Sequence, residues 1–252
     1  MCRHIAYLGP PVPLGRLLTD PAHGLFRQSW APRRQRYGTV NADGFGVGWY
    51  ADQDPVPARY RRPGPIWADP SFTDLARVVR SGALLAAVRD ATEPGADGEA
   101  AAAPFADGRW LFSHNGALRD WPDAVAPLAA GLPPAALLSL ECRTDSALVW
   151  ALIAHRLRAG EDPAAAVSEP VRELAAAAPG SRLNLLLTDG DRILATAWGD
   201  SLWYLADPAA GRVAVASEPY DDDPRWAEVP DRTLLTATRD DVLLTPLKEP
   251  TP

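Results

Sequence analysis

Short apolar runs, each stopped by Gly, Pro or Asp, divide the first half of the chain into strand-length segments. The run Arg3–Leu8 begins directly after Cys2 and stops at Gly9-Pro10, so it predicts a buried strand that starts beside a thiol. Further runs predict strands at Phe45–Tyr50, Ala83–Arg89 and Arg109–His114. Long connections lie between the runs, at residues 29–39, 52–69 and 92–108. Each is most simply a solvated loop, although loops of this length often carry function.

The second half of the chain predicts a pair of helices and then short strands. Thr144 is placed to cap a helix that runs to about Arg158, and Asp162-Pro163 opens a second helix that runs to about Ala178. Short strands separated by tight turns follow and predict an antiparallel meander at Arg182–Leu187, Arg192–Trp198, Ser201–Leu205 and Arg212–Ser217. This order predicts an α+β fold with antiparallel sheets and helices layered on their faces.

The domain organisation follows from the absence of any repeat or linker in this pattern. We expect residues 1–252 to form a single domain, with residues 246–252 as a disordered tail. The longest membrane-like stretch, Ala147–Ala154, is too short to span a bilayer, and the first residues do not resemble a signal peptide. A soluble protein is therefore expected.

Charge and cysteine content narrow the class of partner. The formal net charge is −7 and the pI is about 5.1, which argues against nucleic acid or an anionic membrane as the main partner and favours a small molecule. The two cysteines, Cys2 and Cys142, fit neither a disulfide framework nor a paired Cys-x-x-Cys metal site. We therefore expect a reducing, cytoplasmic location.

The position of Cys2 suggests nucleophilic chemistry. Removal of Met1 would make Cys2 the N-terminal residue, and its own α-amino group, with an ordinary pKa of roughly 7.7–8.0, could then act as the base for its thiol. Because any residue can follow an initiator Met, the position alone does not distinguish this role from an incidental cysteine.

A second motif, FSHNG at Phe112–Gly116, ends a predicted strand and enters a turn. The Asn115 amide and the Gly116 backbone N–H can point the same way there and form an oxyanion hole. The alternative is that Asn-Gly serves only as a turn-forming pair.

Charged side chains stand at two further element ends. Arg89 closes a predicted strand in VRDAT, where its guanidinium could hold a carboxylate with help from Thr92; a surface ion pair is the alternative. Asp145 stands at a helix start, where it could assist capping or face a substrate ammonium. The Gly-rich segment 41–48 has neither the Lys of a P-loop nor dinucleotide-binding spacing, so it predicts close backbone packing beside the site.

Together these motifs resemble the class II glutamine amidotransferases of the N-terminal nucleophile hydrolases. The resemblance rests on MCRH, NADGFGVGW, VRDAT, FSHNG and CRTDS in the family's order, and it extends to about residue 245. It implies a four-layer αββα sandwich and a small-molecule γ-glutamyl substrate. It also implies Cys2 as nucleophile, Asn115 and Gly116 as oxyanion hole, and the substrate-binding residues Arg89, Thr92, His114 and Asp145.

Departures from the family's pattern direct attention to a subgroup. The chain has Val40-Asn41-Ala42 where many members have Arg-Gly-Pro, Ala101-Ala102-Ala103 where they have Asn-x-His, and Ala147 where they have Glu. Two long segments, QSWAPRRQRYGTVNADGFGVGWY and ASEPYDDDPRWAEVPDR, resemble the γ-glutamyl hydrolases of ergothioneine biosynthesis.

The implied substrate of that subgroup carries a quaternary ammonium and carboxylates. Aromatic faces can receive the ammonium, and the candidates are Trp30, Trp49 and Trp226. The basic segment Arg33–Arg36 is the candidate for the carboxylates, with a solvated loop as its alternative.

Three other interpretations remain at the level of sequence. The chain could be a glutaminase subunit that supplies ammonia to a separate synthetase, or a non-catalytic binding or scaffold module. A metal site could use Cys2, His4, His114 and Cys142, but their spacing fits no standard zinc pattern. We therefore expect no metal, no cofactor and no obligate protein partner.

Overall fold

The computed structural model describes residues 2–91 and 98–248, and within them the chain forms two antiparallel sheets. The seven-stranded sheet has the order β11-β9-β10-β1-β4-β2-β3. Its strands are β1 Cys2–Pro13, β2 Phe45–Trp49, β3 Ala58–Arg62, β4 Arg80–Arg89, β9 Trp203–Asp207, β10 Arg212–Ala216 and β11 Ala227–Glu228. The six-stranded sheet has the order β13-β12-β8-β7-β6-β5. Its strands are β5 Phe105–Asp107, β6 Trp110–Ala117, β7 Arg182–Thr188, β8 Ile193–Ala197, β12 Thr233–Ala237 and β13 Val242–Pro246.

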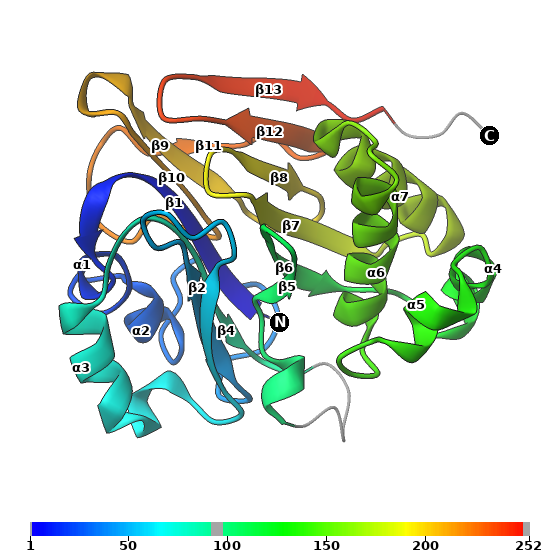
Figure 1. Cartoon of the computed structure of the whole chain (residues 1–252), viewed down its shortest axis with the longest axis horizontal. Helices are drawn as coiled ribbons and strands as arrows, with labels where there is room; N and C mark the ends of the chain where they lie inside the picture. Colours follow the sequence, from blue (N-terminus) through cyan, green and yellow to red (C-terminus); the bar gives the residue numbers. More distant parts are fainter. Residues whose placement is uncertain (1, 92–97, 249–252) are drawn as a thin grey trace.

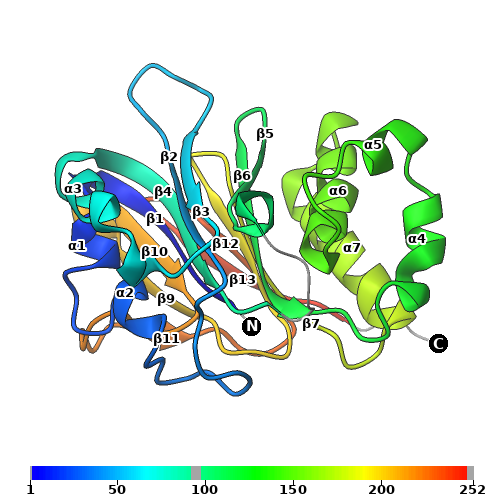
Figure 2. The same cartoon turned by 90° about the horizontal axis from the view of Figure 1, so that it is seen from below.

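Helices cover the outer face of each sheet (Figures 1 and 2). The seven-stranded sheet is covered by α1 Gly15–Leu18, α2 Leu25–Gln28 and α3 Pro70–Val78. The six-stranded sheet is covered by α6 Asp145–Arg158 and α7 Pro163–Ala177, with α4 Ala126–Ala130 and α5 Pro134–Leu138 beside them. Short 3₁₀ turns complete the described elements at Ile66–Ala68, Glu99–Ala101, Asp123–Val125 and Pro208–Ala210. The predicted four-layer αββα sandwich is confirmed.

Alternation along β1 explains why residues 5–8 are apolar on both faces of the strand. Ile5 and Tyr7 pack with the helices of the seven-stranded sheet, whereas Ala6 and Leu8 pack between the two sheets. A strand covered on both faces is apolar on both faces except where a buried polar side chain is hydrogen-bonded, as Arg3 is to Gln35 and His4 to Ser113. A separate hydrophobic cluster joins α6 and α7 to the six-stranded sheet, so three apolar layers hold the four structural layers together.

The predicted helix starts are confirmed by their capping contacts. Thr144 Oγ1 accepts the Ala147 N–H at 3.2 Å at the start of α6. The Asp162 carboxylate accepts the N–H groups of Ala164 and Ala165 at 3.1 Å at the start of α7. These caps fix where α6 begins, and Asp145 is its first residue.

The predicted meander is wrong in its pairing, because its strands divide between the sheets. β7 and β8 pair in the six-stranded sheet, whereas β9 and β10 pair in the seven-stranded one. Each pair is a local hairpin, but the connection at Gly199–Ser201 crosses from one sheet to the other. In the six-stranded sheet, the second strand that pairs with β8 is β12, which lies further along the chain.

Two predicted loops contain strands, and the predicted tail starts too early. β3 lies within residues 52–69 and β5 within residues 92–108. Pro246 pairs with Thr233 at the end of β13, and Leu247 is buried against the α6–α7 layer. The last part of the predicted tail, residues 249–252, lies outside the described residues.

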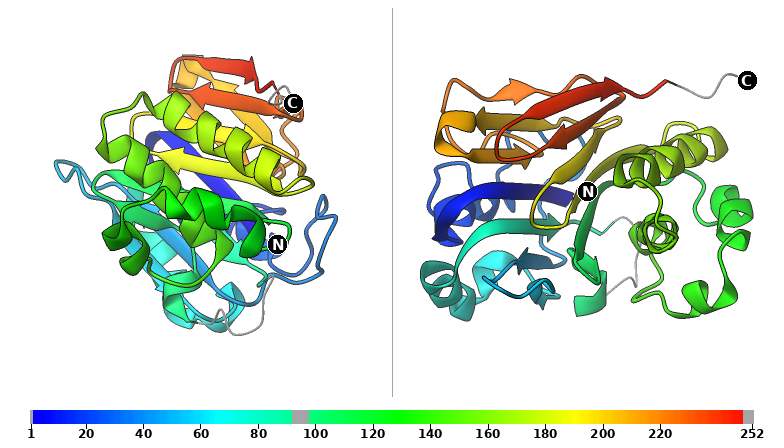
Figure 3. Two further views of the ribbon diagram at one scale, coloured as in Figure 1. Left: turned by 90° about the vertical axis from the view of Figure 1, so that its right-hand side faces the viewer. Right: turned by 45° about the horizontal axis from the view of Figure 1, so that its top comes forward.

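The fold brings the start of β1 to the facing strand of the other sheet. β1 lies between β10 and β4, and Cys2 pairs with Arg89 at the end of β4. β1 begins near the middle of the molecule, where β6 of the six-stranded sheet approaches it (Figure 3). A pocket between the sheets therefore receives side chains from both.

Candidate active site

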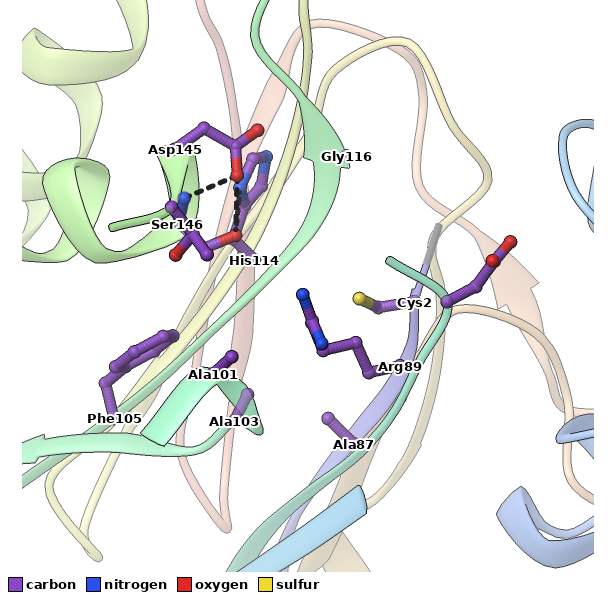
Figure 4. A pocket seen from close by; sticks show the side chains of 12 residues that line it. Cys2, Ala87, Arg89, Ala101, Ala103, Phe105, His114, Gly116, Asp145 and Ser146 are labelled. Atoms are coloured by element: carbon purple, nitrogen blue, oxygen red, sulfur yellow. Dashed lines mark hydrogen bonds between the residues drawn. The ribbon is translucent and has the colours of Figure 1, made fainter. Parts of the chain in front are cut away.

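The start of β1, the end of β4, β6 and the first turn of α6 enclose a pocket with about 560 Å³ of empty space (Figure 4). It is lined by Cys2, Ala87, Arg89, Asp90, Ala101, Ala103, Phe105, His114, Gly116, Thr144, Asp145 and Ser146. The structure thus brings together five of the seven predicted site residues along its walls. Asn115 adjoins this group through Cys2, and Thr92 lies outside the described residues.

The Cys2 thiol lies in a desolvated position that does not by itself produce a thiolate. Burial raises the pKa of the Cys2 thiol, and the positive N-terminus, the Arg89 guanidinium and the Asp90 backbone N–H offset part of that rise. A thiol whose pKa is raised stays protonated near neutral pH and needs a base to become nucleophilic. The candidate for that base is the Cys2 nitrogen, whose N–H donates to Asn115 Oδ1 at 3.2 Å.

Asn115 is fully buried and has contacts on both ends of its side-chain amide. Its oxygen accepts the Cys2 N–H, and its nitrogen lies 3.5 Å from the Ser217 hydroxyl. An amide nitrogen carries two hydrogens, so one can face Ser217 while the other remains for a ligand. This orientation suits Asn115 for a double task, holding the Cys2 nitrogen and stabilising negative charge next to the thiol.

The residue after Asn115 can only be glycine. A Cβ on Gly116 would collide with the Arg182 carbonyl oxygen on β7 and would lie 2.5 Å from His114 Nε2. Glycine therefore allows β6 to approach β7 where the pocket wall is formed. The Asn-Gly pair is consequently part of a paired strand, since Asn115 pairs with Asn184 and Gly116 with Leu183.

The Gly-rich segment, for which the sequence predicted close backbone packing, contacts Arg89. Arg89 Nη1 donates to the Asp43 carbonyl oxygen at 3.1 Å, and the Arg89 backbone is bonded to Asp43 and Gly44. The Asp43 carboxylate also accepts the Ala91 N–H at 2.8 Å. With one guanidinium nitrogen held by a carbonyl, the rest of the group points into the pocket toward the Cys2 sulfur (Figure 4). In the same segment, Gly46 allows the strand to pack closely against Ala103, because a Cβ at position 46 would collide with the Ala103 carbonyl oxygen.

Asp145 is oriented by the backbone around it. One carboxylate oxygen accepts the Leu118 N–H at 3.0 Å, and the other accepts the Ser146 N–H at 2.6 Å. Asp145 is 9 % exposed, so little solvent competes for its remaining lone pairs. A substrate ammonium in the pocket would find a fixed, negatively charged partner here.

His114 lines the pocket, but protein groups occupy both of its ring nitrogens. Nε2 donates to the Arg182 carbonyl oxygen at 2.9 Å, and Nδ1 is within hydrogen-bond distance of the Ser146 hydroxyl at 3.0 Å. The ring therefore fixes β6 against β7 and α6, and it offers substrate an aromatic face instead of a hydrogen bond.

The proposed acceptor-binding tryptophans lie outside this pocket. Trp30 packs edge-on against Phe26 and Trp67, Trp49 packs with the helix-covered core of the seven-stranded sheet, and Trp226 Nε1 donates to Asp221 at 2.7 Å. Their role as ammonium-binding residues is not supported by these positions.

Most of the basic segment is also used internally. Arg33 bonds to Asp222 and to the Pro219 carbonyl oxygen, and the Arg34 guanidinium stacks over Trp203. Gln35 accepts from Arg3 at 3.2 Å. Arg33 and Arg34 therefore anchor the segment and are not displayed to a substrate at this site.

Several residues of the site were missed by sequence reasoning. The Asp43 carbonyl oxygen accepts from Arg89, and the Ser146 hydroxyl contacts His114. The backbone N–H of Asp90 points at the Cys2 thiol. Ser217 takes the His4 N–H at 3.1 Å as well as facing Asn115. Ser217 ends one predicted strand and Asp90 directly follows another, which is the one signal that could have indicated them.

The candidate metal ligands do not converge. Within residues 2–91 and 98–248, no group of three or more His, Cys, Asp or Glu side chains is arranged to hold a metal ion. His4 is buried and bonded to Ser113, and burial, followed by the nearby Arg3 charge, holds its pKa well below the usual range. Cys142 lies near Thr144 Oγ1 at 3.3 Å.

Among the residues that the structure describes, no helix is both long and apolar enough to cross a membrane.

Two stacked antiparallel sheets with a cysteine at the start of a central strand form the architecture of an N-terminal nucleophile hydrolase. The model of the family "Glutamine amidotransferases class-II" matches residues 21–210. The chain therefore belongs to the class II glutamine amidotransferase family.

Individual relatives agree with this assignment. The chain is 45 % identical to the γ-glutamyl-hercynylcysteine sulfoxide hydrolase of Mycolicibacterium smegmatis over 98 % of this chain and 100 % of that protein. A class II glutamine amidotransferase domain protein of known structure from Silicibacter pomeroyi has a TM-score of 0.69 and 26 % identity, covering 98 % and 100 % of the two chains. The phosphoribosylpyrophosphate amidotransferase of Bacillus subtilis shares the fold, with a TM-score of 0.67 at 15 % identity over 98 % of this chain and 49 % of that one.

Proposed function

We propose that this protein is a cysteine-dependent hydrolase that releases glutamate from γ-glutamyl-hercynylcysteine sulfoxide in ergothioneine biosynthesis. The observation that carries the proposal is 45 % identity to a hydrolase of that name over 98 % of this chain and the whole of that protein. The pocket supports it, because a buried thiol, a guanidinium and a carboxylate surround one small-molecule space.

The reaction begins at Cys2 once Met1 has been removed. The free α-amino group accepts the thiol proton, and the thiolate attacks the γ-carbonyl carbon of the substrate. Because burial raises the pKa of the thiol, this proton transfer is needed before attack. Asn115 Oδ1 holds the nitrogen that acts as the base, at 3.2 Å.

Charge then develops on the carbonyl oxygen. The second hydrogen of the Asn115 amide and the Gly116 backbone N–H are the proposed donors, and such preorganised donors act most strongly in a site sheltered from water. The protonated amine gives its proton to the leaving nitrogen, which leaves a γ-glutamyl thioester on Cys2. Water, activated by the same amine, hydrolyses that thioester and releases glutamate.

The glutamyl group is positioned by charge. Arg89, assisted by Thr92, is the proposed partner of the α-carboxylate, and Asp145 is the proposed partner of the α-ammonium. Arg89 and Asp145 extend from opposite walls of the pocket, from β4 and α6 (Figure 4). His114 is reassigned to a positioning role, since its nitrogens are engaged.

We extend the proposal to the protein's setting. A single domain spanning residues 1–252 carries out the reaction with no obligate protein partner, no nucleic acid, no membrane and no cofactor. Both cysteines are free thiols, and a nucleophilic thiol remains reduced in the cytoplasm, where we place the protein.

Kinetics on two substrates test the proposal. We expect kcat/KM for γ-glutamyl-hercynylcysteine sulfoxide to exceed that for glutamine by at least ~100-fold, about 2.7 kcal/mol. The Cys2→Ala variant serves as the inactive control. Comparable efficiency on both substrates would overturn the assignment and favour a glutaminase that supplies ammonia to a separate synthetase.

A further inference from the structure

A second groove adjoins the pocket at the end of β6. It is lined by Tyr37, Ala117, Leu118, Arg119, Asp120, Trp121, Asp145 and Arg182 and has about 930 Å³ of empty space. Asp145 lines both the pocket and the groove, and Gly116 of the pocket is followed by Ala117 of the groove. A ligand too large for the Cys2 pocket can therefore continue into the groove without leaving the protein.

The groove begins close to the residues that would meet the leaving group. The leaving nitrogen must be within reach of the Cys2 amine, which contacts Asn115, and the groove begins two residues further along the same strand. Gly38 also packs so tightly on the Asp90 carboxylate that a Cβ there would collide with it. Tyr37 is thus held next to a residue that lines the Cys2 pocket.

Tyr37 is a fixed aromatic surface although it is 52 % exposed. The guanidinium of Arg182 covers one face of its ring, 4.4 Å from the centroid, and a buried ion pair with Asp200 at 3.2 Å holds Arg182. Because Tyr37 is half exposed, part of its surface remains accessible to a ligand. A ring supported in this way loses little conformational freedom when it binds.

The segment before Tyr37 is fixed by a buried carboxylate. Glu218 is fully buried and accepts the backbone N–H groups of Arg33 and Arg34 at 3.0 and 2.7 Å. On the other side, Gln35 Oε1 accepts from Asn41 Nδ2 at 3.0 Å. The two long segments that resemble the ergothioneine hydrolases therefore meet at Glu218, and together they set the position of Tyr37.

Two opposite charges stand next to each other in the groove. Arg119 and Asp120 are both exposed, and neither side chain forms an ion pair with any residue that the structure describes. A cation and an anion beside the aromatic rings of Tyr37 and Trp121 match a betaine, which carries a quaternary ammonium and a carboxylate on one carbon. Aromatic faces and a nearby carboxylate favour the ammonium, and a guanidinium favours the carboxylate.

We propose that this groove is the subsite for the leaving half of the substrate, with Tyr37 contacting its quaternary ammonium and Arg119 contacting its carboxylate. The proposal rests on the proposed function, because it assigns the part of the substrate that glutamine lacks. It makes residues 33–37 a specificity-determining segment through Tyr37, whereas Arg33 and Arg34 serve as its anchors.

Kinetics with a matched pair of substrates test this assignment. γ-Glutamyl-hercynylcysteine sulfoxide carries the betaine half, and γ-glutamylcysteine has the same scissile amide without it. We expect Tyr37→Ala and Arg119→Gln each to lower the ratio of the two kcat/KM values about 10-fold, which is ~1.4 kcal/mol. Tyr37→Phe should retain the preference because the ring, not the hydroxyl, makes the contact. Arg77→Gln, on the distant helix α3, is the control and should leave both rates unchanged.

The outcomes separate the subsite from the function. Loss of the preference in both test variants, with retention in Tyr37→Phe and Arg77→Gln, supports the subsite. A wild-type preference that both test variants keep overturns the subsite and leaves the proposed function standing. A wild-type enzyme that cleaves both substrates equally also overturns the subsite, whereas the function is judged separately by the comparison with glutamine.

Discussion

Replacement of Asn115 tests the double task that the structure gives this residue. Asn115→Ala removes one donor to the transition-state oxyanion and also the acceptor that holds the Cys2 nitrogen at 3.2 Å. Loss of one oxyanion donor costs roughly 10²–10³ in kcat, or ~2.7–4 kcal/mol. Since that charge is absent from the bound substrate, we expect KM to change little.

A matched variant separates the two tasks. Asn115→Asp keeps an oxygen for the Cys2 amine but has no N–H for the oxyanion, so kcat should fall at least as far as in Asn115→Ala. Its carboxylate also favours the protonated amine, so the acidic limb of the kcat/KM profile should move to higher pH. Steady-state kinetics across pH, with thermal unfolding as a check on folding, measure both effects. An effect of either substitution confined to KM would refute the reasoning.

Three further predictions concern other walls of the pocket. Arg89→Lys should raise KM and lower kcat/KM about 10-fold or more, because an ammonium cannot reproduce the two-pronged hold on a carboxylate; wild-type kinetics would show that the clamp is misplaced. Because burial raises the pKa of the Cys2 thiol, the thiol is protonated at neutral pH, and kcat/KM should climb as the α-amine deprotonates near roughly pH 7.7–8. A profile already flat from pH 5 would indicate a preformed thiolate instead. Gly116→Ala should yield protein with a lowered melting temperature and little activity, since its Cβ collides with the Arg182 carbonyl oxygen; a variant as stable as the wild type would contradict that packing.

Three of the residues that sequence reasoning located stand at the end of a regular element. Cys2 starts β1, Arg89 ends β4, and Asp145 starts α6. Local signals such as apolar runs, caps and Gly mark those ends directly. Antiparallel sheets then bring such ends together, which is why a linear motif order predicted a common pocket.

Contacts between distant segments could not be predicted in this way. Glu218 lies 185 residues from Arg33 and 184 from Arg34, and nothing in either local pattern indicates that they pair. The same limit explains why the sequence predicted one meander, although β9 and β10 lie in a different sheet from β7 and β8. A hairpin has the same sequence signals in either sheet, and the choice depends on which neighbour, β1 or β7, remains unpaired.

The tryptophans show a different limit. Burial against other aromatic rings and one hydrogen bond account for Trp30 and Trp226, whereas an exposed tyrosine stands beside the groove. Residue type alone does not distinguish an aromatic side chain of the core from one that faces a ligand.

Mass spectrometry of the enzyme quenched during turnover tests the central claim most directly. With γ-glutamyl-hercynylcysteine sulfoxide as substrate, we expect the intact chain to lack Met1 and to carry one γ-glutamyl group, which fragmentation places on Cys2 as a thioester. The Cys2→Ala variant should carry none. Full activity in a preparation that retains Met1, or turnover with the γ-glutamyl group on a residue other than Cys2, would contradict the account.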